Sequence, residues 1–278
     1  MKNVKQIWQE TAKQLEKVYD RREAENISYI LLEDAFDISK TEILFDGNLD
    51  VDTDRLDSYI KRLLQFEPIQ YVTGVADFYG RKFQVAPGSL IPRPETEELV
   101  ELIIRENNVE KPRILDVGVG SGCIAATLSL EFKVQVFGTD VSGEAIAIAE
   151  KNSNELGAQS VFHQSDILKE NLPESNLDIL VSNPPYIPQK ELVEMSKNVT
   201  EHEPEIALFV PDNDPLIFYK RIADEGLKSL KKGGKLYFEI HEKFGAIVKE
   251  YLQDVGYSEA AIHQDMQGKD RVVSGVKV

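Results

Sequence analysis

The chain has 278 residues and a formal net charge of −16 at pH 7. This length is sufficient for one domain of ordinary enzyme size and a smaller second domain. The acidic excess is spread over both halves of the chain, which disfavours general affinity for a nucleic-acid backbone. The charge suits either a cationic protein partner or simple solubility, and the composition leaves both interpretations open.

Cysteine, histidine and apolar content exclude several further classes of protein. Cys123 is the single cysteine, so an internal disulfide and a cysteine-based metal cluster are excluded. The four histidines are scattered along the chain, and we expect no metal site. The N-terminal residues lack a signal-peptide core, and no apolar run approaches membrane-spanning length. We therefore expect a cytoplasmic protein that does not associate with membranes.

Residues 1–70 are predicted to form a small helical bundle. Their apolar residues recur at the spacing of amphipathic helices. Ser39, followed three residues later by Glu42, predicts a capping box. Asp52 or Thr53 is placed to cap a further helix. We interpret this segment as a domain of its own.

The composition and the residue pattern of the sequence change after residue 70. In residues 71–92, β-forming stretches at 71–74 and 83–85 alternate with glycine and proline, which predicts a β-hairpin linker. The segment that follows, Pro92-Arg93-Pro94-Glu95-Thr96, has proline and acidic residues where the start of a helix favours them. We therefore expect a helix to open the second domain.

From residue 113 the pattern alternates between strand and helix. We predict strands at 113–117, 134–139, 160–164, 177–182 and 236–240, helices at 143–156, around 216–230 and up to 255, a turn at 231–234 and two terminal strand-like segments. This alternation predicts an α/β fold whose parallel sheet has helices on both faces. Ligands of such sheets bind at the carboxyl ends of the strands.

The loop Gly118-Val119-Gly120-Ser121-Gly122 follows the first of these strands. Its glycines allow close approach of the backbone to an anion, and its spacing departs from the dinucleotide fingerprint. Asp140 is placed to accept hydrogen bonds from ribose hydroxyls, and Asp166 from an adenine amino group. Together these features fit S-adenosylmethionine, an adenosyl ligand without a diphosphate. For the glycines alone, a tight strand–helix turn is the alternative.

The segment Asn183-Pro184-Pro185-Tyr186 follows the fourth of these strands. The Asn183 side-chain carbonyl and the Pro184 backbone carbonyl offer two acceptors, which matches the two donors of an amide NH2 group. Proline stiffens the loop, and Tyr186 offers a flat face for stacking. The segment therefore suits the methylation of a planar NH2 group, with an ordinary turn as the alternative.

These motifs resemble those of known enzymes. Residues 115–122 are similar to the cofactor motif of class I methyltransferases, and residues 183–186 to the motif shared by DNA adenine and protein glutamine methyltransferases. With the stretches 71–74, 90–97, 203–208 and 268–272, the whole chain resembles the HemK/PrmC family of peptide chain release factor N5-glutamine methyltransferases. One departure is Ile167, where relatives often carry an aromatic residue.

The resemblance implies a fold and an activity. The fold is a Rossmann-like class I methyltransferase with a mainly parallel seven-stranded sheet over residues 93–278, after the helical domain (1–70) and the hairpin linker (71–92). The activity is transfer of a methyl group from S-adenosylmethionine to the glutamine of the Gly-Gly-Gln loop of class I release factors. The helical domain then docks the release factor or only stabilises the chain. We expect a monomer that does not bind nucleic acid directly.

The expected site residues follow from the motifs and the resemblance together. The catalytic residues are Asn183, Pro184 and Tyr186. The cofactor-binding residues are Gly118, Val119, Gly120, Ser121, Gly122, Asp140, Asp166, Ile167 and Asn183. The substrate-binding residues are Asn183, Pro184, Pro185, Tyr186 and Arg93. The alternatives are a DNA adenine-N6 methyltransferase and a non-catalytic adenosyl-binding adaptor, and the role of Glu239 stays open.

Overall fold

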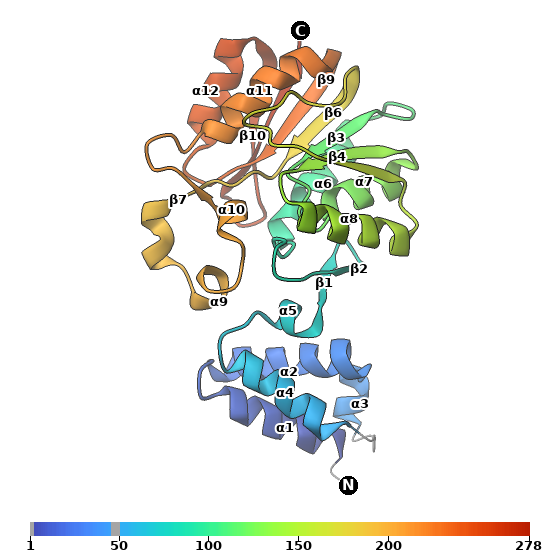
Figure 1. The fold of residues 1–278 in the computed structure, drawn as a ribbon, viewed down its shortest axis with the longest axis vertical. Helices are drawn as coiled ribbons and strands as arrows, with labels where there is room; N and C mark the ends of the chain where they lie inside the picture. Colours follow the sequence, from blue (N-terminus) through green and yellow to red (C-terminus); the bar gives the residue numbers. More distant parts are fainter. Residues whose placement is uncertain (1–2, 46–50) are drawn as a thin grey trace. The chain divides into compact units, whose positions relative to one another are not determined.

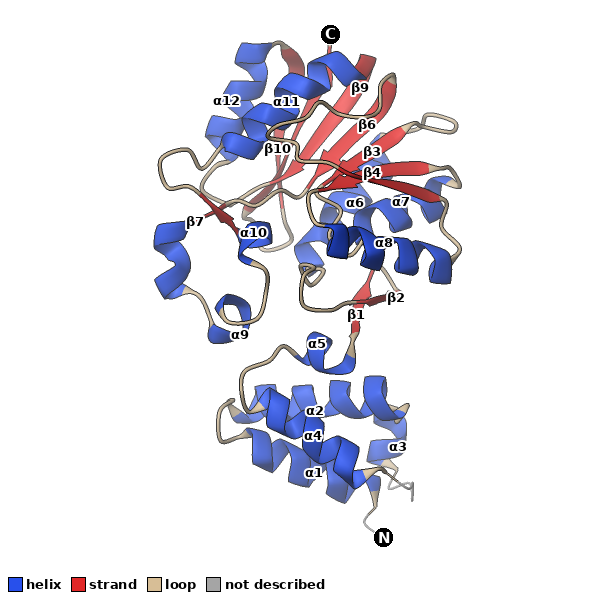
Figure 2. Cartoon of the chain, in the orientation of Figure 1, coloured by secondary structure: helices blue, strands red, loops and turns tan. Residues whose placement is uncertain are grey.

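The computed structural model describes residues 3–45 and 51–278 (Figures 1 and 2). The chain folds into two compact units, one of Met1–Val75 with Ser196–His202 and one of Ala76–Met195 with Glu203–Val278. Within the described ranges, none of the helices combines the length and apolarity that crossing a membrane requires.

The first unit is helical. Its helices are α1 (Val4–Leu15), α2 (Arg21–Phe36), α3 (Lys40–Leu44), α4 (Thr53–Leu63), α5 (Ile69–Thr73) and α9 (Lys197–Thr200). The apolar faces of α1 to α5 meet in one core, in which Leu15, Leu31 and Leu63 are fully buried. The predicted helical bundle is therefore confirmed.

Two predicted helix starts in this unit are also confirmed. Ser39 and Glu42 form a capping box at α3, with each side chain bonded to the backbone N–H of the other residue. Asp52, rather than Thr53, caps α4 by accepting a hydrogen bond of 3.0 Å from the Arg55 N–H. These caps satisfy N–H groups that have no partner within a helix.

The strand character expected at residues 71–74 is wrong, because these residues form the end of helix α5. Pro68 precedes the helix, and Gly74 closes it in the left-handed conformation with φ of 81°. The Arg62 guanidinium donates hydrogen bonds to the carbonyls of Tyr71 and Val72. This tertiary contact stabilises free carbonyls at the helix end, and it overrides the local β propensity of the two residues.

The predicted β-hairpin follows α5. Strands β1 (Val75–Phe78) and β2 (Arg81–Gln84) form a two-stranded sheet. Both turn residues, Tyr79 and Gly80, have positive φ, which matches the right-handed twist of a tight hairpin. The buried Phe78 and Phe83 rings pack edge to face at 5.9 Å in the core of the second unit.

The second unit contains the seven-stranded sheet that the resemblance implies. Its strands are β3 (Ile114–Val117), β4 (Val136–Asp140), β5 (Ser160–Gln164), β6 (Leu177–Ser182), β9 (Leu230–Glu239), β10 (Tyr257–Gln264) and β11 (Asp270–Lys277). Their order is β10-β11-β9-β6-β3-β4-β5. The strands from β9 to β5 are parallel, and β11 is antiparallel to both of its neighbours. The predicted mainly parallel α/β fold is confirmed.

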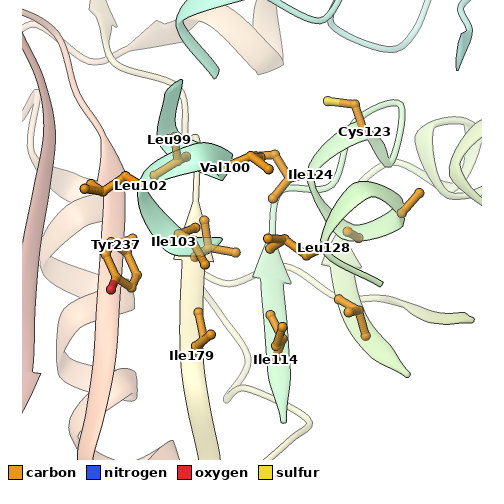
Figure 3. Packing of buried hydrophobic residues seen from close by; sticks show 14 of the residues in the cluster. Leu99, Val100, Leu102, Ile103, Ile114, Cys123, Ile124, Leu128, Ile179 and Tyr237 are labelled. Atoms are coloured by element: carbon orange, nitrogen blue, oxygen red, sulfur yellow. The ribbon is translucent and has the colours of Figure 1, made fainter. Parts of the chain in front are cut away.

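Helices cover both faces of this sheet, as predicted. They are α6 (Pro94–Glu106), α7 (Cys123–Phe132), α8 (Gly143–Leu156), α11 (Ile217–Ser229) and α12 (Gly245–Val255). Figure 3 shows Ile103 of α6 and Leu128 of α7 beside Ile114 and Ile179 of the sheet. A second core lies between the sheet and helices α11 and α12.

The turn predicted at residues 231–234 is not a boundary between elements, because β9 already begins at Leu230. The pairing between β6 and β9 shifts register there, from Leu177 opposite Leu230 to Ile179 opposite Lys235. The glycine-rich segment is thus an irregularity inside a long strand. Because β9 pairs with β6 on both sides of residues 231–234, these residues belong to the strand.

The segment after residue 186 contains several short elements. Within the second unit they are β7 (Ile187–Pro188), the 3₁₀ helix η1 (Gln189–Glu194), α10 (Glu205–Leu208) and β8 (Phe209–Val210). β7 pairs in parallel with β8, so the segment closes on itself. The chain therefore comes back to Ile187–Pro188 before α11 begins.

Candidate active site

The candidate site lies beside β3, where the order in which the chain adds strands to the sheet reverses. β3 pairs with β4 on one side and β6 on the other, and Val117 lies opposite Ser182. The loops that start at Gly118 and Asn183 therefore leave neighbouring strands at the same edge of the sheet. The Ser182 hydroxyl donates a hydrogen bond of 2.6 Å to the Val117 carbonyl, which joins the two strand ends. This is the switch point at which ligands of such sheets bind.

A cavity of about 240 Å³ lies at this switch point. The predicted site residues that line it are Gly118, Gly120, Asp140, Asp166, Ile167, Asn183, Pro184 and Pro185. Ser89, Ile206 and Phe218 also line it and were not predicted as site residues. They come from segments distant in the sequence, so spacing alone could not place them there.

Asp140 holds the glycine loop in shape. Its carboxylate accepts hydrogen bonds of 2.9 Å from the N–H groups of Gly120 and Ser142. Burial raises the pKa of Asp140, and the bonds from backbone N–H groups oppose this shift. Gly118 and Gly120 have φ of 81° and 52°, in the left-handed region that glycine adopts most easily. The loop therefore presents its backbone to the cavity.

Three predicted cofactor residues of this loop do not line the cavity. Val119 and Ser121 are buried. At Gly122, an added Cβ would lie 2.8 Å from the Ala149 Cβ, so the missing side chain allows α8 to approach the loop. These residues shape the loop, and their direct contact with a cofactor stays a prediction.

Asn152 of α8 is a structural residue of the site that the motifs did not predict. Its side-chain N–H groups donate to the carbonyls of Ser121 at 2.8 Å and Gln84 at 2.9 Å, and its oxygen accepts from the Gln84 N–H at 2.7 Å. It therefore ties the glycine loop to the β-hairpin. The only sequence signal was a polar residue on the buried face of a helix.

Asp116 is a second residue that sequence reasoning missed. It lies in β3, two residues before Gly118, and its side chain is fully buried. Within the described part of the chain, neither of its carboxylate oxygens has a hydrogen-bond partner, and only the backbone N–H of Ala125 lies where it favours the ionised form. Burial, and then the charge of Asp140, raises the pKa of Asp116 well above its usual range. An unpartnered buried acid beside a ligand loop suits a cationic ligand group.

Asp166 and Ile167 form another part of the cavity wall. Asp166 accepts a hydrogen bond from the Leu168 N–H at 3.0 Å and pairs with Lys169 at 2.8 Å. The bond from Lys169 is the main cause that lowers the pKa of Asp166, so this acid is ionised at neutral pH. The Ile167 carbonyl accepts a hydrogen bond from Arg221, which fixes this turn to α11.

Two buried side chains, Thr96 and Glu239, orient Asn183 through hydrogen bonds. Its Nδ2 donates to Thr96 Oγ1 at 3.3 Å, and Thr96 Oγ1 donates to Glu239 Oε2 at 2.6 Å. The Tyr186 hydroxyl donates to the other oxygen of Glu239 at 3.5 Å. Because the Asn183 NH2 group is engaged, its side-chain oxygen is the atom left for a ligand.

Tyr186 does not line the main cavity. It borders a second cavity of about 300 Å³ together with His241 and Arg271, and its ring packs edge to face on His241 at 6.0 Å. Burial raises the pKa of Tyr186, so its hydroxyl stays protonated. Stacking of its ring on a substrate stays a prediction.

Arg93 also lies outside the lining of both cavities. It forms an ion pair with Glu203, a buried acid that also accepts a hydrogen bond of 3.3 Å from the Ile91 N–H. Arg93 therefore fastens the segment that precedes α6 to the segment that carries Ile206 and Ala207 into the cavity wall. Its contact with substrate stays a prediction.

Over residues 3–45 and 51–278, no group of three or more His, Cys, Asp or Glu side chains is placed to hold a metal ion.

The sheet order and the glycine loop define a class I S-adenosylmethionine-dependent methyltransferase. A methyltransferase from Pyrococcus furiosus has the same fold, with a TM-score of 0.53 and 18% identity over 80% of this chain and 98% of its own. A SAM-dependent O-methyltransferase from Thermotoga maritima matches with a TM-score of 0.50 and 16% identity over 79% of this chain and 81% of its own. Residues 96–203 match the family model "Methyltransferase small domain".

Closer relatives identify the family within this class. Residues 6–74 match the family model "PrmC N-terminal domain". A release factor glutamine methyltransferase of Bacteroides thetaiotaomicron is 43% identical over 265 residues, which are 94% of this chain and 95% of that protein. One of Flavobacterium psychrophilum is 39% identical over 93% of this chain and 94% of its own length. The chain belongs to the release factor glutamine methyltransferase family, which confirms the resemblance.

Proposed function

We propose that the chain transfers a methyl group from S-adenosylmethionine to the side-chain amide nitrogen of the glutamine in the Gly-Gly-Gln loop of class I release factors. The names of its relatives support the substrate. The single observation that carries the chemistry is the orientation of Asn183, whose NH2 group bonds to Thr96 at the edge of the main cavity. Its oxygen is thereby available to a donor on the substrate.

The side chains around the main cavity fit S-adenosylmethionine. Asp140 can accept from ribose hydroxyls and the ionised Asp166 from the adenine amino group, and both line the cavity. The unpartnered, buried Asp116 lies beside the loop and suits the positively charged end of the methionine portion. When bound, the cofactor supplies a methyl group on a positively charged sulfur.

Asn183 and Pro184 supply the positioning that the reaction needs. An amide nitrogen is a weak nucleophile because its lone pair is delocalised. The Asn183 side-chain oxygen and the Pro184 carbonyl accept its two hydrogens, which fixes the direction of the lone pair and stabilises positive charge on the nitrogen. Once methylated, the nitrogen is acidic and loses one of these protons to water, which leaves a neutral N-methyl amide. Orientation of this kind can contribute about 7–11 kcal/mol in favourable systems.

The wider organisation is part of the same proposal. Residues 1–70 form the domain that docks the release factor, residues 71–92 the linker, and residues 93–278 the methyltransferase domain. The match of residues 6–74 to the family model "PrmC N-terminal domain" supports a separate domain at residues 1–70. The protein acts as a cytoplasmic monomer that binds a protein substrate and not nucleic acid, in keeping with its net charge of −16.

The test is methyl transfer to defined substrates. Purified protein is incubated with methyl-labelled S-adenosylmethionine and either a class I release factor or adenine-containing duplex DNA, and the label is mapped by mass spectrometry. We expect label on the Gly-Gly-Gln glutamine. We also expect Asn183→Ala to lower turnover by about 100-fold or more with cofactor affinity within about twofold, as loss of a preorganised polar contact does.

The matched control is Asn154→Ala, which removes the same side chain from an exposed position on α8. It should leave turnover unchanged. Label only on DNA would establish the adenine-N6 alternative. Cofactor binding without label on either substrate would favour the adaptor.

A further inference from the structure

We propose that Thr96 and Glu239 are positioning residues that set the direction of the Asn183 side-chain amide, with its oxygen toward the substrate and its NH2 group toward the protein. The proposal deepens the function proposed above and rests on it. It concerns which way a single side chain faces, a property on which the reaction depends.

The three residues form one hydrogen-bonded line from the protein interior to the cavity. Glu239 at the end of β9 is 1% exposed, and Thr96 in the first turns of α6 is 2% exposed. Thr96 Oγ1 lies 2.6 Å from Glu239 Oε2 and 3.3 Å from Asn183 Nδ2. Asn183 is the only one of the three that lines the cavity.

The donor and acceptor roles in this series of hydrogen bonds are fixed while Glu239 is ionised. A carboxylate can only accept hydrogen bonds, so the single proton of the Thr96 hydroxyl is directed to Glu239. The Thr96 oxygen then has only lone pairs to offer Asn183, and only the NH2 end of the amide can bond to it. The Asn183 oxygen is consequently turned to the cavity, where the substrate amide needs an acceptor.

Protonation of Glu239 removes this constraint. A carboxylic acid can donate to Thr96, which frees the Thr96 proton to bond to the Asn183 oxygen. The amide can then rotate by half a turn and present its NH2 group to the cavity. Two NH2 groups facing each other cannot hydrogen-bond, so the site loses one of its two acceptors.

The surroundings of Glu239 allow it to change charge near neutral pH. Burial raises its pKa to about 7, while Thr96, Arg271 and Tyr186 favour the ionised form and Glu95 disfavours it. The Arg271 guanidinium is bonded to Asp265, and no ion pair within the described residues engages Glu239. From α11, the Tyr219 hydroxyl bonds to the Glu239 backbone carbonyl rather than to its side chain.

A purely structural role is a weak explanation for this arrangement. Burying an acid whose partners are hydroxyl groups is unfavourable, and an apolar side chain would fill the same space at lower cost. Acids of this kind gather at functional sites. Here the bonds of Glu239 lead through Thr96 to the one side chain on which the proposed chemistry depends.

The first measurement compares three threonine variants with labelled cofactor and a class I release factor. Thr96→Val keeps the shape and removes the hydroxyl, so kcat should fall at least about 20-fold while the Kd for S-adenosylmethionine changes less than about twofold. Thr96→Ser keeps the hydroxyl and should retain most of kcat. Thr127→Val is the matched control, since the buried Thr127 hydroxyl has no partner within the described chain and its loss should not change kcat.

The second measurement is the dependence of kcat on pH. Only the ionised form of Glu239 directs Asn183, so kcat of the wild type should fall about tenfold from pH 8 to pH 6, as a group with a pKa of about 7 requires. In Glu239→Gln this titration should disappear. An unchanged pH profile in that variant, or full kcat in Thr96→Val, would overturn the proposal.

The third measurement does not require turnover. Protein labelled with ¹⁵N-asparagine shows the Asn183 side-chain NH2 resonances by NMR, assigned by their loss in Asn183→Ala. These resonances should shift with pH around 7 in the wild type and not in Glu239→Gln. If they do not titrate, the positioning role is wrong even if the release factor is methylated. If they titrate and the release factor is not methylated, the proposed substrate fails and the orienting line stands.

Discussion

Glu239 also makes stability depend on pH, in the direction opposite to activity. Its pKa is about 7 in the folded protein, above the ordinary value of 4.5, so between these limits the folded state binds the proton more tightly than the unfolded state. The stability that protonation contributes is therefore present below about pH 4.5 and lost as the pH rises to 7. The total loss from this group is about 3 kcal/mol.

Urea unfolding of the wild type and Glu239→Gln between pH 4.5 and 8 measures this effect. The difference in unfolding free energy between the two proteins should shift against the wild type by about 3 kcal/mol as the pH rises. Subtracting the variant removes the contributions of the other acids. Parallel curves for the two proteins would show that Glu239 does not titrate in this range.

Residue by residue, the sequence located those parts of the site that are contiguous in it. The glycine loop and the segment from Asn183 are short motifs, and their residue types alone indicate which ligand groups they bind. Thr96 and Glu239 are separated by 143 residues, and only the fold brings them together. The sequence leaves a structural and a functional role for Glu239 equally open, because no residue near it in the chain distinguishes a pocket residue from a core residue.

At the level of elements, Asn152 of α8 joins three parts of the second unit. It satisfies both backbone groups of Gln84 in the hairpin and the carbonyl of Ser121 in the glycine loop. Asn152→Ala leaves these backbone groups without this partner, and we expect it to lower the unfolding free energy by about 2–4 kcal/mol. Urea unfolding measures the change.

The control for this prediction lies on the same helix. Asn154 is exposed, and Asn154→Ala should change stability by less than about 0.5 kcal/mol. Equal effects of the two substitutions would mean that loss of helix-surface polarity, and not the bridge to the loop, destabilises the protein.

Elements with a strong pattern of their own were predicted with accurate bounds. Helix α8 and strand β5 begin and end at the predicted residues. The errors fell on segments whose structure is decided by a partner: Tyr71 and Val72 are helical because Arg62 bonds to their carbonyls, and residues 231–234 stay within β9 because both flanks pair with β6. Local propensity carries no information on either partner.

For the molecule as a whole, the alternation of strands and helices predicted the α/β class, whereas the resemblance implied the seven strands. The antiparallel edge formed by β10 and β11 could not be deduced from periodicity, because an alternating segment reads the same in either direction. The sequence also predicted the boundary between the two structural units only in part. Ser196–His202 lies in the first unit, although it follows the Asn183 loop in the chain.

The net charge of −16 is a property of the whole molecule, and it leads to a final prediction. If the acidic surface attracts a basic region of the release factor, salt should weaken the encounter, because exposed charges are screened over about 8–10 Å at 0.1–0.15 M salt. We expect KM for the release factor to rise at least about threefold between 50 and 200 mM salt. The value of kcat should stay constant, since Asn183, Thr96 and Glu239 act after binding. A KM that does not change with salt would assign the acidic surface to solubility alone.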